Sequence, residues 1–169
     1  NVSIDGNDPI DVGSHAVSFI NYYAENLYNE ASITLGELSI RGNHIDAGGD
    51  GISITRYYVG FYMYDDSQIT IGDVRVESNT VDAVAPIHIR YDDVAYTMYQ
   101  SATLTMGDTY VRDNVTSSPS STAHGLHIDY DPRPNEYDVC AYLYDEVFGE
   151  LPDYVITGNS FDVGGDGIY

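Results

Sequence analysis

The sequence predicts an all-β solenoid built from about four to five coils of one repeating unit, with little or no helix. Three observations predict it: an asparagine that recurs at nearly constant spacing, short runs of alternating apolar and polar residues, and a tyrosine-rich segment in each repeat. Self-similarity at a fixed period is typical of repeat architectures, in which each unit buries its apolar face against its neighbours. The chemistry of such a chain is therefore expected in columns of equivalent residues.

The recurring asparagines are separated by 36, 36, 35 and 45 residues, and each follows an apolar residue by three positions. They are Asn7, Asn43, Asn79, Asn114 and Asn159, and the last also follows Val155 with one extra residue. Asparagine tolerates the left-handed conformation that a corner needs, and stacked side-chain amides hydrogen-bond from coil to coil. We therefore expect a structural asparagine ladder, with the asparagines themselves at the corners.

The alternating runs are short and are punctuated by glycine and asparagine, as in residues 68–72, 74–76 and 87–90. Strict alternation of this kind indicates β-strands, and no segment has the apolar spacing of a helix. Gly36, Gly72 and Gly107 follow equivalent strands, where close approach of two backbones is expected. The alternation predicts inward columns, which are Ile33/Ile69/Leu104, Ile4/Ile40/Val76/Val111/Ile156, Val17/Ile52/Ile87/Leu126 and Phe19/Ile54/Ile89/Ile128.

The chain is expected to form one domain, residues 1–169, because its length suits a single continuous core. The repeats span roughly 16–50, 51–85, 86–124 and 125–166, with partial repeats at 1–15 and 167–169. Both ends look like interrupted repeats without a polar cap. The sequence is therefore interpreted as a piece of something longer or as a unit that stacks end to end.

The composition excludes several classes of partner. The formal net charge is −21, from 27 acidic residues against six arginines. Such a surface repels nucleic acid and anionic membranes, and no apolar run is long enough for membrane insertion. A hydrophobic content of 43% argues against disorder. The single cysteine, Cys140, excludes an internal disulfide framework and is interpreted as a small sheet residue.

The string Ile69-Thr70-Ile71…Val76-Glu77-Ser78-Asn79-Thr80-Val81 resembles the coil signature of right-handed parallel β-helices of the pectin-lyase-like superfamily. The glycine–isoleucine strand openings at Gly51-Ile52 and Gly167-Ile168 strengthen the resemblance. It implies a right-handed parallel β-helix. That superfamily includes lyases, glycosidases, tailspikes, adhesins and surface-layer repeats, and this chain resembles the surface or sheath-type members more than the enzymes. It departs from the family in its longer coils, each of which carries an extra tyrosine-rich segment.

Four tyrosines occupy one position in these segments, five residues before the first apolar residue of the returning strand. They are Tyr28, Tyr64, Tyr99 and Tyr142. Stacked tyrosines contribute about 0.5–1.5 kcal/mol per pair beyond their burial, so an aromatic column that holds the coils together is the preferred interpretation. A sugar-binding platform and an interface with another subunit are the alternatives.

Acidic residues recur near the ladder and are candidates for Ca²⁺ binding. Asp46, Asp82 and Asp162 stand three residues after a ladder asparagine, and the segment Asp46-Ala47-Gly48-Gly49-Asp50 recurs with Asp162 and Asp166 at its ends. Stacked carboxylates repel each other unless a cation lies between them or they point into solvent. Oxygen-rich, flexible sites suit Ca²⁺. A calcium site and solvated turn residues are thus both open.

His88 and His127 occupy equivalent outward positions, preceded in their column by Ser18 and Ser53. Two adjacent imidazoles can bind a metal or take part in acid–base chemistry, with Asp129, Asp92 and Asp93 nearby. Outward histidines on a sheet are otherwise exposed or hydrogen-bonded to neighbours. No catalytic residues are assigned, because paired carboxylates arise by chance among so many acids and the arginines are scattered through several columns.

These patterns favour an extracellular or cell-surface structural protein that associates with copies of itself in a sheath, surface layer, filament or adhesin stalk. Open solenoid ends expose strand edges that template further strands. The alternative is a carbohydrate-active or carbohydrate-binding β-helix whose partner is a cell-surface polysaccharide. Its glycan-binding groove would be lined by Tyr57, Tyr58, Tyr62, His88, Asp92 and Asp93.

Overall fold

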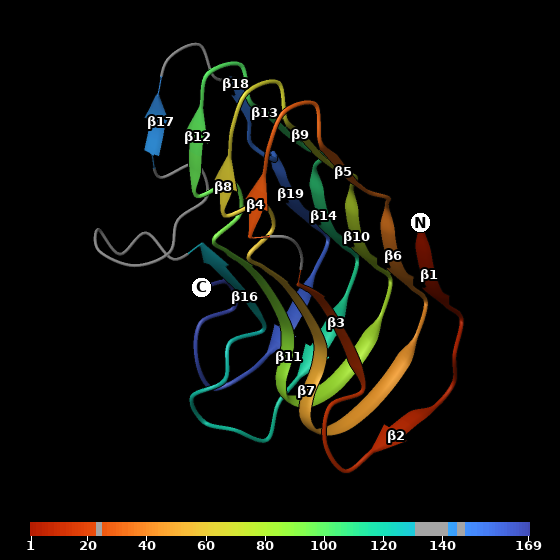
Figure 1. Ribbon diagram of the computed structural model, residues 1–169. Helices are drawn as coiled ribbons and strands as arrows, with labels where there is room; N and C mark the ends of the chain where they lie inside the picture. Colours follow the sequence, from red (N-terminus) through yellow and green to blue (C-terminus); the bar gives the residue numbers. More distant parts are fainter. Residues whose placement is uncertain (23–24, 131–141, 145–147) are drawn as a thin grey trace.

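The computed structural model describes residues 1–22, 25–130, 142–144 and 148–169, which form an all-β parallel solenoid (Figure 1). It has about three turns, fewer than the four to five expected, because the first and last coils are incomplete within these residues. The described residues contain no helix, as the alternation predicts, and hence no helical segment that could cross a membrane. Cys140 lies outside the described residues.

Two sheets meet at the asparagine corner. The five strands of the first sheet, in spatial order, are β1 (Val2–Asp5), β6 (Leu38–Arg41), β10 (Val74–Glu77), β14 (Thr109–Arg112) and β19 (Tyr154–Thr157). The strands of the second sheet are β2 (Ile10–Val12), β7 (His44–Tyr57), β11 (Thr80–Asp92), β15 (Val115–Ser117) and β20 (Ser160–Asp162), with β3 (Val17–Tyr22) on β7 and β16 (Leu126–Tyr130) on β11.

Two smaller sheets complete the coil. One forms the arm that carries the tyrosine-rich segments and contains β4 (Asn26–Leu27), β8 (Tyr62–Met63), β12 (Thr97–Tyr99) and β17 (Tyr142–Tyr144). The other returns the chain to the next coil and contains β5 (Ser32–Leu35), β9 (Gln68–Ile71), β13 (Thr103–Met106) and β18 (Phe148–Glu150). All strand pairs in the four sheets are parallel, so equivalent residues of successive coils lie side by side (Figure 1).

The predicted inward columns form the core. Ile40 pairs in register with Val76, and Val76 with Val111, all with no exposed surface. Ile52 and Ile87 form the equivalent pair on the second sheet. Stacked β-branched side chains pack well on a pleated surface, so each coil covers the apolar face of the next. Ile156, not Val155, pairs with Val111, which restores the strict three-residue spacing in the last coil.

The corner itself differs from the expectation in one respect. The left-handed conformation belongs to the residue before each ladder asparagine, and the asparagines do not adopt it. These preceding residues, with their φ angles, are Gly6 (65°), Gly42 (61°), Ser78 (57°), Asp113 (54°) and Gly158 (68°). Glycine adopts this conformation without steric cost, which explains its presence at three of the five positions. The asparagine is instead selected for its side-chain amide.

The prediction for the glycines after the returning strands is confirmed. A Cβ atom at Gly72 would lie 2.7 Å from the backbone nitrogen of Glu37, and one at Gly107 would lie 2.6 Å from the backbone nitrogen of Asp73. Real Cβ atoms do not approach backbone so closely. Glycine is therefore required where adjacent coils come together beside the corner.

Candidate functional site: stacked side-chain columns

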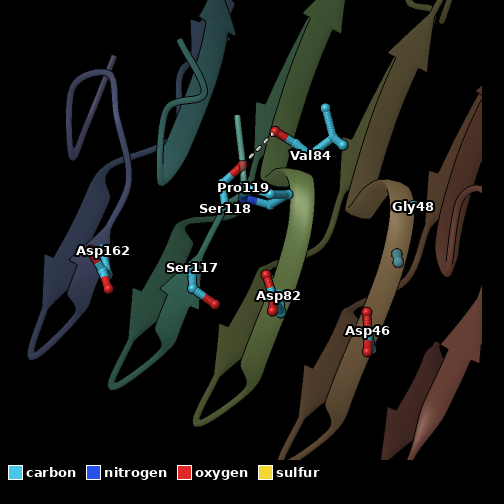
Figure 2. Close-up of a pocket in the computed structure, with 9 residues that line it drawn as sticks. Asp46, Gly48, Asp82, Val84, Ser117, Ser118, Pro119 and Asp162 are labelled. Atoms are coloured by element: carbon cyan, nitrogen blue, oxygen red, sulfur yellow. Dashed lines mark hydrogen bonds between the residues drawn. The ribbon is translucent and has the colours of Figure 1, made fainter. Parts of the chain in front are cut away.

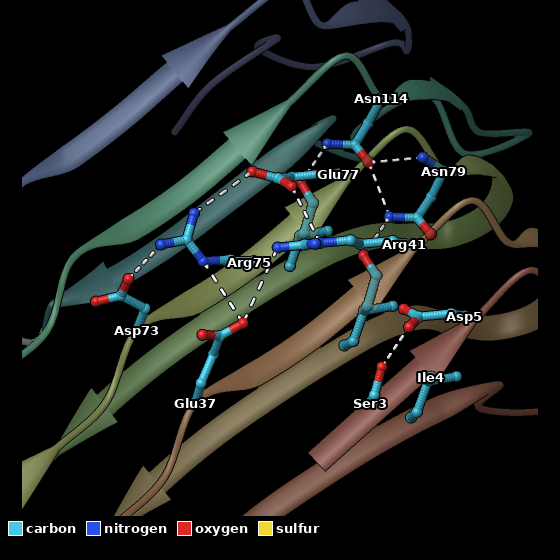
Figure 3. Close-up of polar contacts among 12 residues, drawn as sticks. Ser3, Ile4, Asp5, Glu37, Arg41, Asp73, Arg75, Glu77, Asn79 and Asn114 are labelled. Carbon is cyan, nitrogen blue, oxygen red and sulfur yellow. Dashed lines mark hydrogen bonds and ion pairs between the residues drawn. The ribbon is translucent and has the colours of Figure 1, made fainter. Parts of the chain in front are cut away.

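The asparagine ladder runs through every coil in the described residues. From Asn43 onward, each amide oxygen accepts hydrogen bonds from both the backbone N–H and the side-chain amide of the asparagine one coil earlier. At the centre, Asn43 donates to Asn79 with both groups at 3.0 Å. Asn79 in turn donates to Asn114 at 3.0 and 2.9 Å (Figure 3). The second amide hydrogen of Asn79 goes to the Ile40 carbonyl at 3.0 Å. Asn79 is 1% exposed, and these hydrogen bonds pair all the polar groups of its side chain, as buried polar groups require.

The ladder has a direction, and its two ends differ. Asn7 donates to Asn43, but among the described residues nothing donates to the Asn7 amide oxygen. At the other end, Asn159 accepts from Asn114 and donates its side-chain amide to the Val111 carbonyl. Its backbone N–H has no acceptor within the described residues. The first coil thus offers an acceptor and the last coil a donor.

The outer face of the first sheet carries ion pairs that link coils. Arg41 contacts Glu77 at 3.1 Å and Arg75 contacts Glu37 at 3.6 Å, while Arg75 also binds Asp73 (Figure 3). These side chains are partly exposed, and pairs of this kind contribute little each. They place two of the six arginines in structural contacts.

The aromatic column is present for the described side chains. The rings of Tyr28 and Tyr64 stack with centroids 4.9 Å apart and planes 8° apart, and those of Tyr64 and Tyr99 at 4.8 Å and 3°. Partial burial and the neighbouring tyrosines raise the pKa of the Tyr64 phenol above its usual range. The prediction of Tyr142 as the fourth member is wrong by two residues, because Tyr144 of β17 pairs with Tyr99. The tyrosines therefore form a ladder of stacked rings on the surface of the arm.

The residues expected to line a glycan groove do not all lie together in the structure. Tyr57 packs edge-on against Tyr58 at 4.2 Å, and Tyr62 belongs to the same exposed aromatic cluster through Phe61. Asp92 and Asp93 are 1% and 0% exposed, so their carboxylates do not lie on the surface beside these rings. The ring of His88 stacks on another histidine, on the outer face of β11. Glycan binding stays a prediction for the tyrosines.

Three of the candidate calcium ligands line one shallow depression on the second sheet. Asp46 pairs in register with Asp82, Asp82 with Ser117, and Ser117 with Asp162. All three carboxylates are exposed and point outward, and with Ser118 and Pro119 they border a hollow of about 420 Å³ (Figure 2). Ser117, three residues after Asn114, interrupts the acidic column. Calcium at this column stays a prediction.

The other two candidates, Asp50 and Asp166, lie apart from this depression and make equivalent contacts with histidines. The backbone N–H of Asp50 donates to Nδ1 of His15 at 3.2 Å, and that of Asp166 donates to Nδ1 of His124 at 3.1 Å. The recurrence of the Gly-Gly-Asp segment thus reflects one histidine–aspartate contact made twice. The sequence analysis missed both histidine partners, because they lie 35 and 42 residues from their aspartates.

The outward column of Ser18, Ser53, His88 and His127 is in register, as expected. The imidazole rings of His88 and His127 are stacked, with centroids 4.8 Å apart and planes 13° apart. Asp129 lies two residues after His127 on the same face of β16. One ligand atom from each of these three residues lies within 4.8 Å of the other two, and no other such group of His, Cys, Asp or Glu occurs in the part of the chain that the structure describes.

The surroundings of His88 favour the neutral form of its imidazole. Burial, followed by the neighbouring His127, lowers the pKa of the His88 imidazole below its usual range, against the opposing effect of Asp129 and Asp50. Its Nε2 atom is buried and has no hydrogen-bond partner in the part of the chain that the structure describes. A neutral imidazole with a buried, unpaired ring nitrogen is a potential metal ligand. The pattern His127-x-Asp129, combined with the histidine one coil away, is the sequence signal for this cluster.

Comparisons with protein-family models, with curated proteins and with solved structures give no match for this chain. Its function must therefore be inferred from its own columns of side chains.

Proposed function

We propose that this chain is an extracellular structural protein whose solenoids associate end to end to build a sheath, surface layer, filament or adhesin stalk. The observation that carries the proposal is the polarity of the asparagine ladder. Its first member, Asn7, offers an amide oxygen without a described donor, and its last member, Asn159, offers an N–H without a described acceptor. Stacking of the last coil of one copy on the first coil of the next copy satisfies both.

The strand edges are complementary in the same way. On β1, the N–H groups of Val2 and Gly6 donate to β6, so by alternation the polar groups of Ser3 and Asp5 point to the open edge. On β19, the carbonyls of Asp153 and Thr157 accept from β14, so those of Tyr154, Ile156 and Gly158 point to the other open edge.

The register between coils extends naturally across such a junction. Within the chain, the N–H of Leu38 donates to the carbonyl of Asp73, the residue before Val74. At an equivalent junction, the N–H of Tyr154 would donate to the carbonyl of the residue before Val2 of the next copy. In this register Asn159 meets Asn7, so the ladder continues without a break. Unpaired edges of this type are templates for further strands.

Surface aromatic residues support stacking of copies as well. Tyr28 is the first described member of the tyrosine column and is 54% exposed. Phe148 on β18 is 58% exposed at the opposite end of the solenoid. Stacking on these residues would add apolar burial to the backbone hydrogen bonds.

The handedness of the coil and the type of structural role that we propose come from the resemblance to right-handed β-helices of the pectin-lyase-like superfamily. That resemblance favours a right-handed coil and a role like that of surface or sheath-type members. Location at the cell surface or outside the cell belongs to this proposal, as does Ca²⁺ in the aspartate column between Asp46 and Asp162.

Carbohydrate binding is the second candidate, and the exposed aromatic cluster around Tyr57, Tyr58 and Tyr62 favours it. Sugars bind to open ring faces. In the tyrosine column, however, each face of Tyr64 is covered by a neighbouring ring at 4.8 to 4.9 Å. The column therefore leaves only ring edges for a glycan along most of its length, which makes the structural role the stronger proposal.

Sedimentation velocity over a range of protein concentrations, with negative-stain microscopy of the same samples, tests the proposal. We expect concentration-dependent linear assemblies of the unmodified chain. The variant Ser3→Pro removes an N–H from the open edge of β1 without touching the bonds to β6, so it should remain monomeric with an almost unchanged Tm. Ser3→Ala is the matched control, since it removes the contact between the Ser3 hydroxyl and Asp5 but keeps the N–H.

Equal assembly of Ser3→Pro and Ser3→Ala would show that this edge is not the junction. A monomeric unmodified chain at all concentrations, together with a Tm that rises on addition of an acidic polysaccharide, would favour the carbohydrate proposal instead. A chelator added to the assemblies tests the calcium column, because loss of assembly would place the cation in the contacts.

A further inference from the structure

We propose that His88, His127 and Asp129 form a binding site for a transition-metal ion, with Zn²⁺ as the expected occupant. The site lies on the outer face of the second sheet, where β11 and β16 run side by side. It is separate from the aspartate column and from the ladder ends, and it does not depend on end-to-end assembly.

The backbone brings the three ligands together. His88 pairs in register with His127, and Asp129 follows on the same side of β16 because side chains alternate along a strand. The three ligand atoms lie within 4.8 Å of one another. Zinc–ligand bonds of about 2.0–2.2 Å imply ligand atoms roughly 3.3–3.5 Å apart in a tetrahedral site. Small side-chain rotations close this difference, and the strands need not move.

The buried ring nitrogen of His88 distinguishes this cluster from ordinary surface histidines. Its Nε2 atom has no hydrogen-bond partner among the described residues. An unpaired buried polar atom is destabilising, and a bound cation removes that cost.

The ligand types select the metal. Two imidazoles and one carboxylate suit zinc and similar first-row ions, whereas Ca²⁺ and Mg²⁺ prefer oxygen ligands alone. Three protein ligands leave one position for water. The acidic surface attracts cations generally, and Asp50 adds negative charge close to His88.

Neighbouring side chains hold the ligands in place. Tyr169 packs edge-on against the His127 ring at 4.9 Å and stacks on His124 at 4.5 Å, which limits rotation of the His127 ring. Arg90 lies 3.9 Å from the carboxylate of Asp129, but its closer partner is Asp92. Asp129 is therefore only weakly engaged and is available to a metal. Supporting contacts of this kind usually tune metal affinity.

Isothermal titration of the metal-free protein with Zn²⁺, and absorption spectroscopy with Co²⁺ as a probe of coordination, test the site. We expect one ion per chain and a Co²⁺ spectrum typical of tetrahedral nitrogen and oxygen ligands. His88→Gln and His127→Gln should each weaken zinc binding by at least about 10- to 100-fold, the loss that even supporting residues cause in known sites. His44→Gln is the matched control, because it removes an exposed histidine that contacts Asp8 instead.

Circular dichroism melting of every variant separates loss of ligand from loss of fold. Unchanged affinity in both His88→Gln and His127→Gln would overturn the proposal, as would a Co²⁺ spectrum of an octahedral ion. Equal weakening by His44→Gln would show that zinc binds to scattered histidines and not to this cluster. A selective loss in the two cluster variants, with the Tm of the metal-free proteins retained, would support it.

Discussion

The asparagine ladder and the histidine column are both stacks of like side chains on neighbouring coils, yet they have opposite properties. Asn43, Asn79 and Asn114 are 2%, 1% and 0% exposed, and each amide is hydrogen-bonded in both directions. His88 and His127 are half-buried on an outer face, and the buried Nε2 of His88 is unpaired. One stack is complete without a ligand, and the other is not.

This difference shows that buried columns of a solenoid stabilise the fold, whereas outward columns are available for binding. A buried polar column is tolerated only when every member is satisfied, so the ladder specifies the corner and the register of the coils. An outward column faces solvent and is under no such constraint. It can therefore vary from serine at Ser18 and Ser53 to histidine at His88 and His127 without disturbing the fold.

The largest effect is expected at the centre of the ladder. In Asn79→Ala, the backbone N–H and side-chain amide of Asn43 and the carbonyl of Ile40 all lose their partner. Buried groups left unpaired cost about 1–3 kcal/mol each, so the variant should lose at least about 3 kcal/mol of unfolding free energy. Denaturant unfolding monitored by circular dichroism measures the loss.

Asn7→Ala is the matched control at the end of the same ladder. Asn7 is exposed, and its backbone N–H still donates to Asn43 after truncation, so the loss should stay below about 1 kcal/mol. Similar losses in the two variants would mean that the ladder's hydrogen bonds do not hold the coils together.

The sequence was sufficient for the features that depend on spacing, and insufficient for those that depend on contacts between coils. The asparagine frame, the apolar columns and the stacking of Tyr28, Tyr64 and Tyr99 all follow from repeated spacing. The left-handed corner was assigned to the wrong residue. Ser78 and Asp113 occupy it in two coils, so no glycine marks the position throughout the chain.

The individual members of the histidine cluster were harder to select, for a physical reason. The sequence pairs His88 with His127, and the register confirms this histidine pair. The sequence also places Asp129, Asp92 and Asp93 nearby. It does not reveal that Asp92 and Asp93 are 1% and 0% exposed, because burial depends on packing between coils.

Arg56 shows how residue type can mislead. It stands two residues after the inward Ile54, so the alternation of β7 places it on the core face, although a charged residue is expected outside. It is 1% exposed, burial lowers the pKa of its guanidinium, and its Nε and Nη1 atoms have no hydrogen-bond partner among the described residues.

An intermediate effect is expected in the tyrosine column, a stack without directional hydrogen bonds between its rings. Tyr64→Ala removes two stacked pairs and should cost about 1–3 kcal/mol, from about 0.5–1.5 kcal/mol per pair. Tyr28→Ala removes one described pair and should cost about half as much. Unfolding free energies of the two variants give the ratio, and equal losses would show that the contribution is burial at each site and not stacking.

The smallest effect is expected in the histidine column, and it appears as a change in pH dependence. Because the native-state pKa of His88 lies below the ordinary value of about 6.5, the unfolded chain binds more protons between these two pKa values. The stability of the metal-free protein should therefore fall as the pH is lowered through this window, and recover as it is raised above about 6.5.

His88→Gln removes that contribution, so its stability should change less with pH than that of the unmodified chain. The groups that face His88 are His127, Asp129, Asp50 and Arg90, and all of them remain in the variant. Thermal melts across the window, in a chelator and with His44→Gln as the control, measure the difference. Parallel curves for His88→Gln and the unmodified chain would mean that the imidazole is as well solvated in the folded protein as in the unfolded one. The outward column would then lack the incomplete pairing that sets it apart from the ladder, and the contrast between the two stacks would reduce to burial alone.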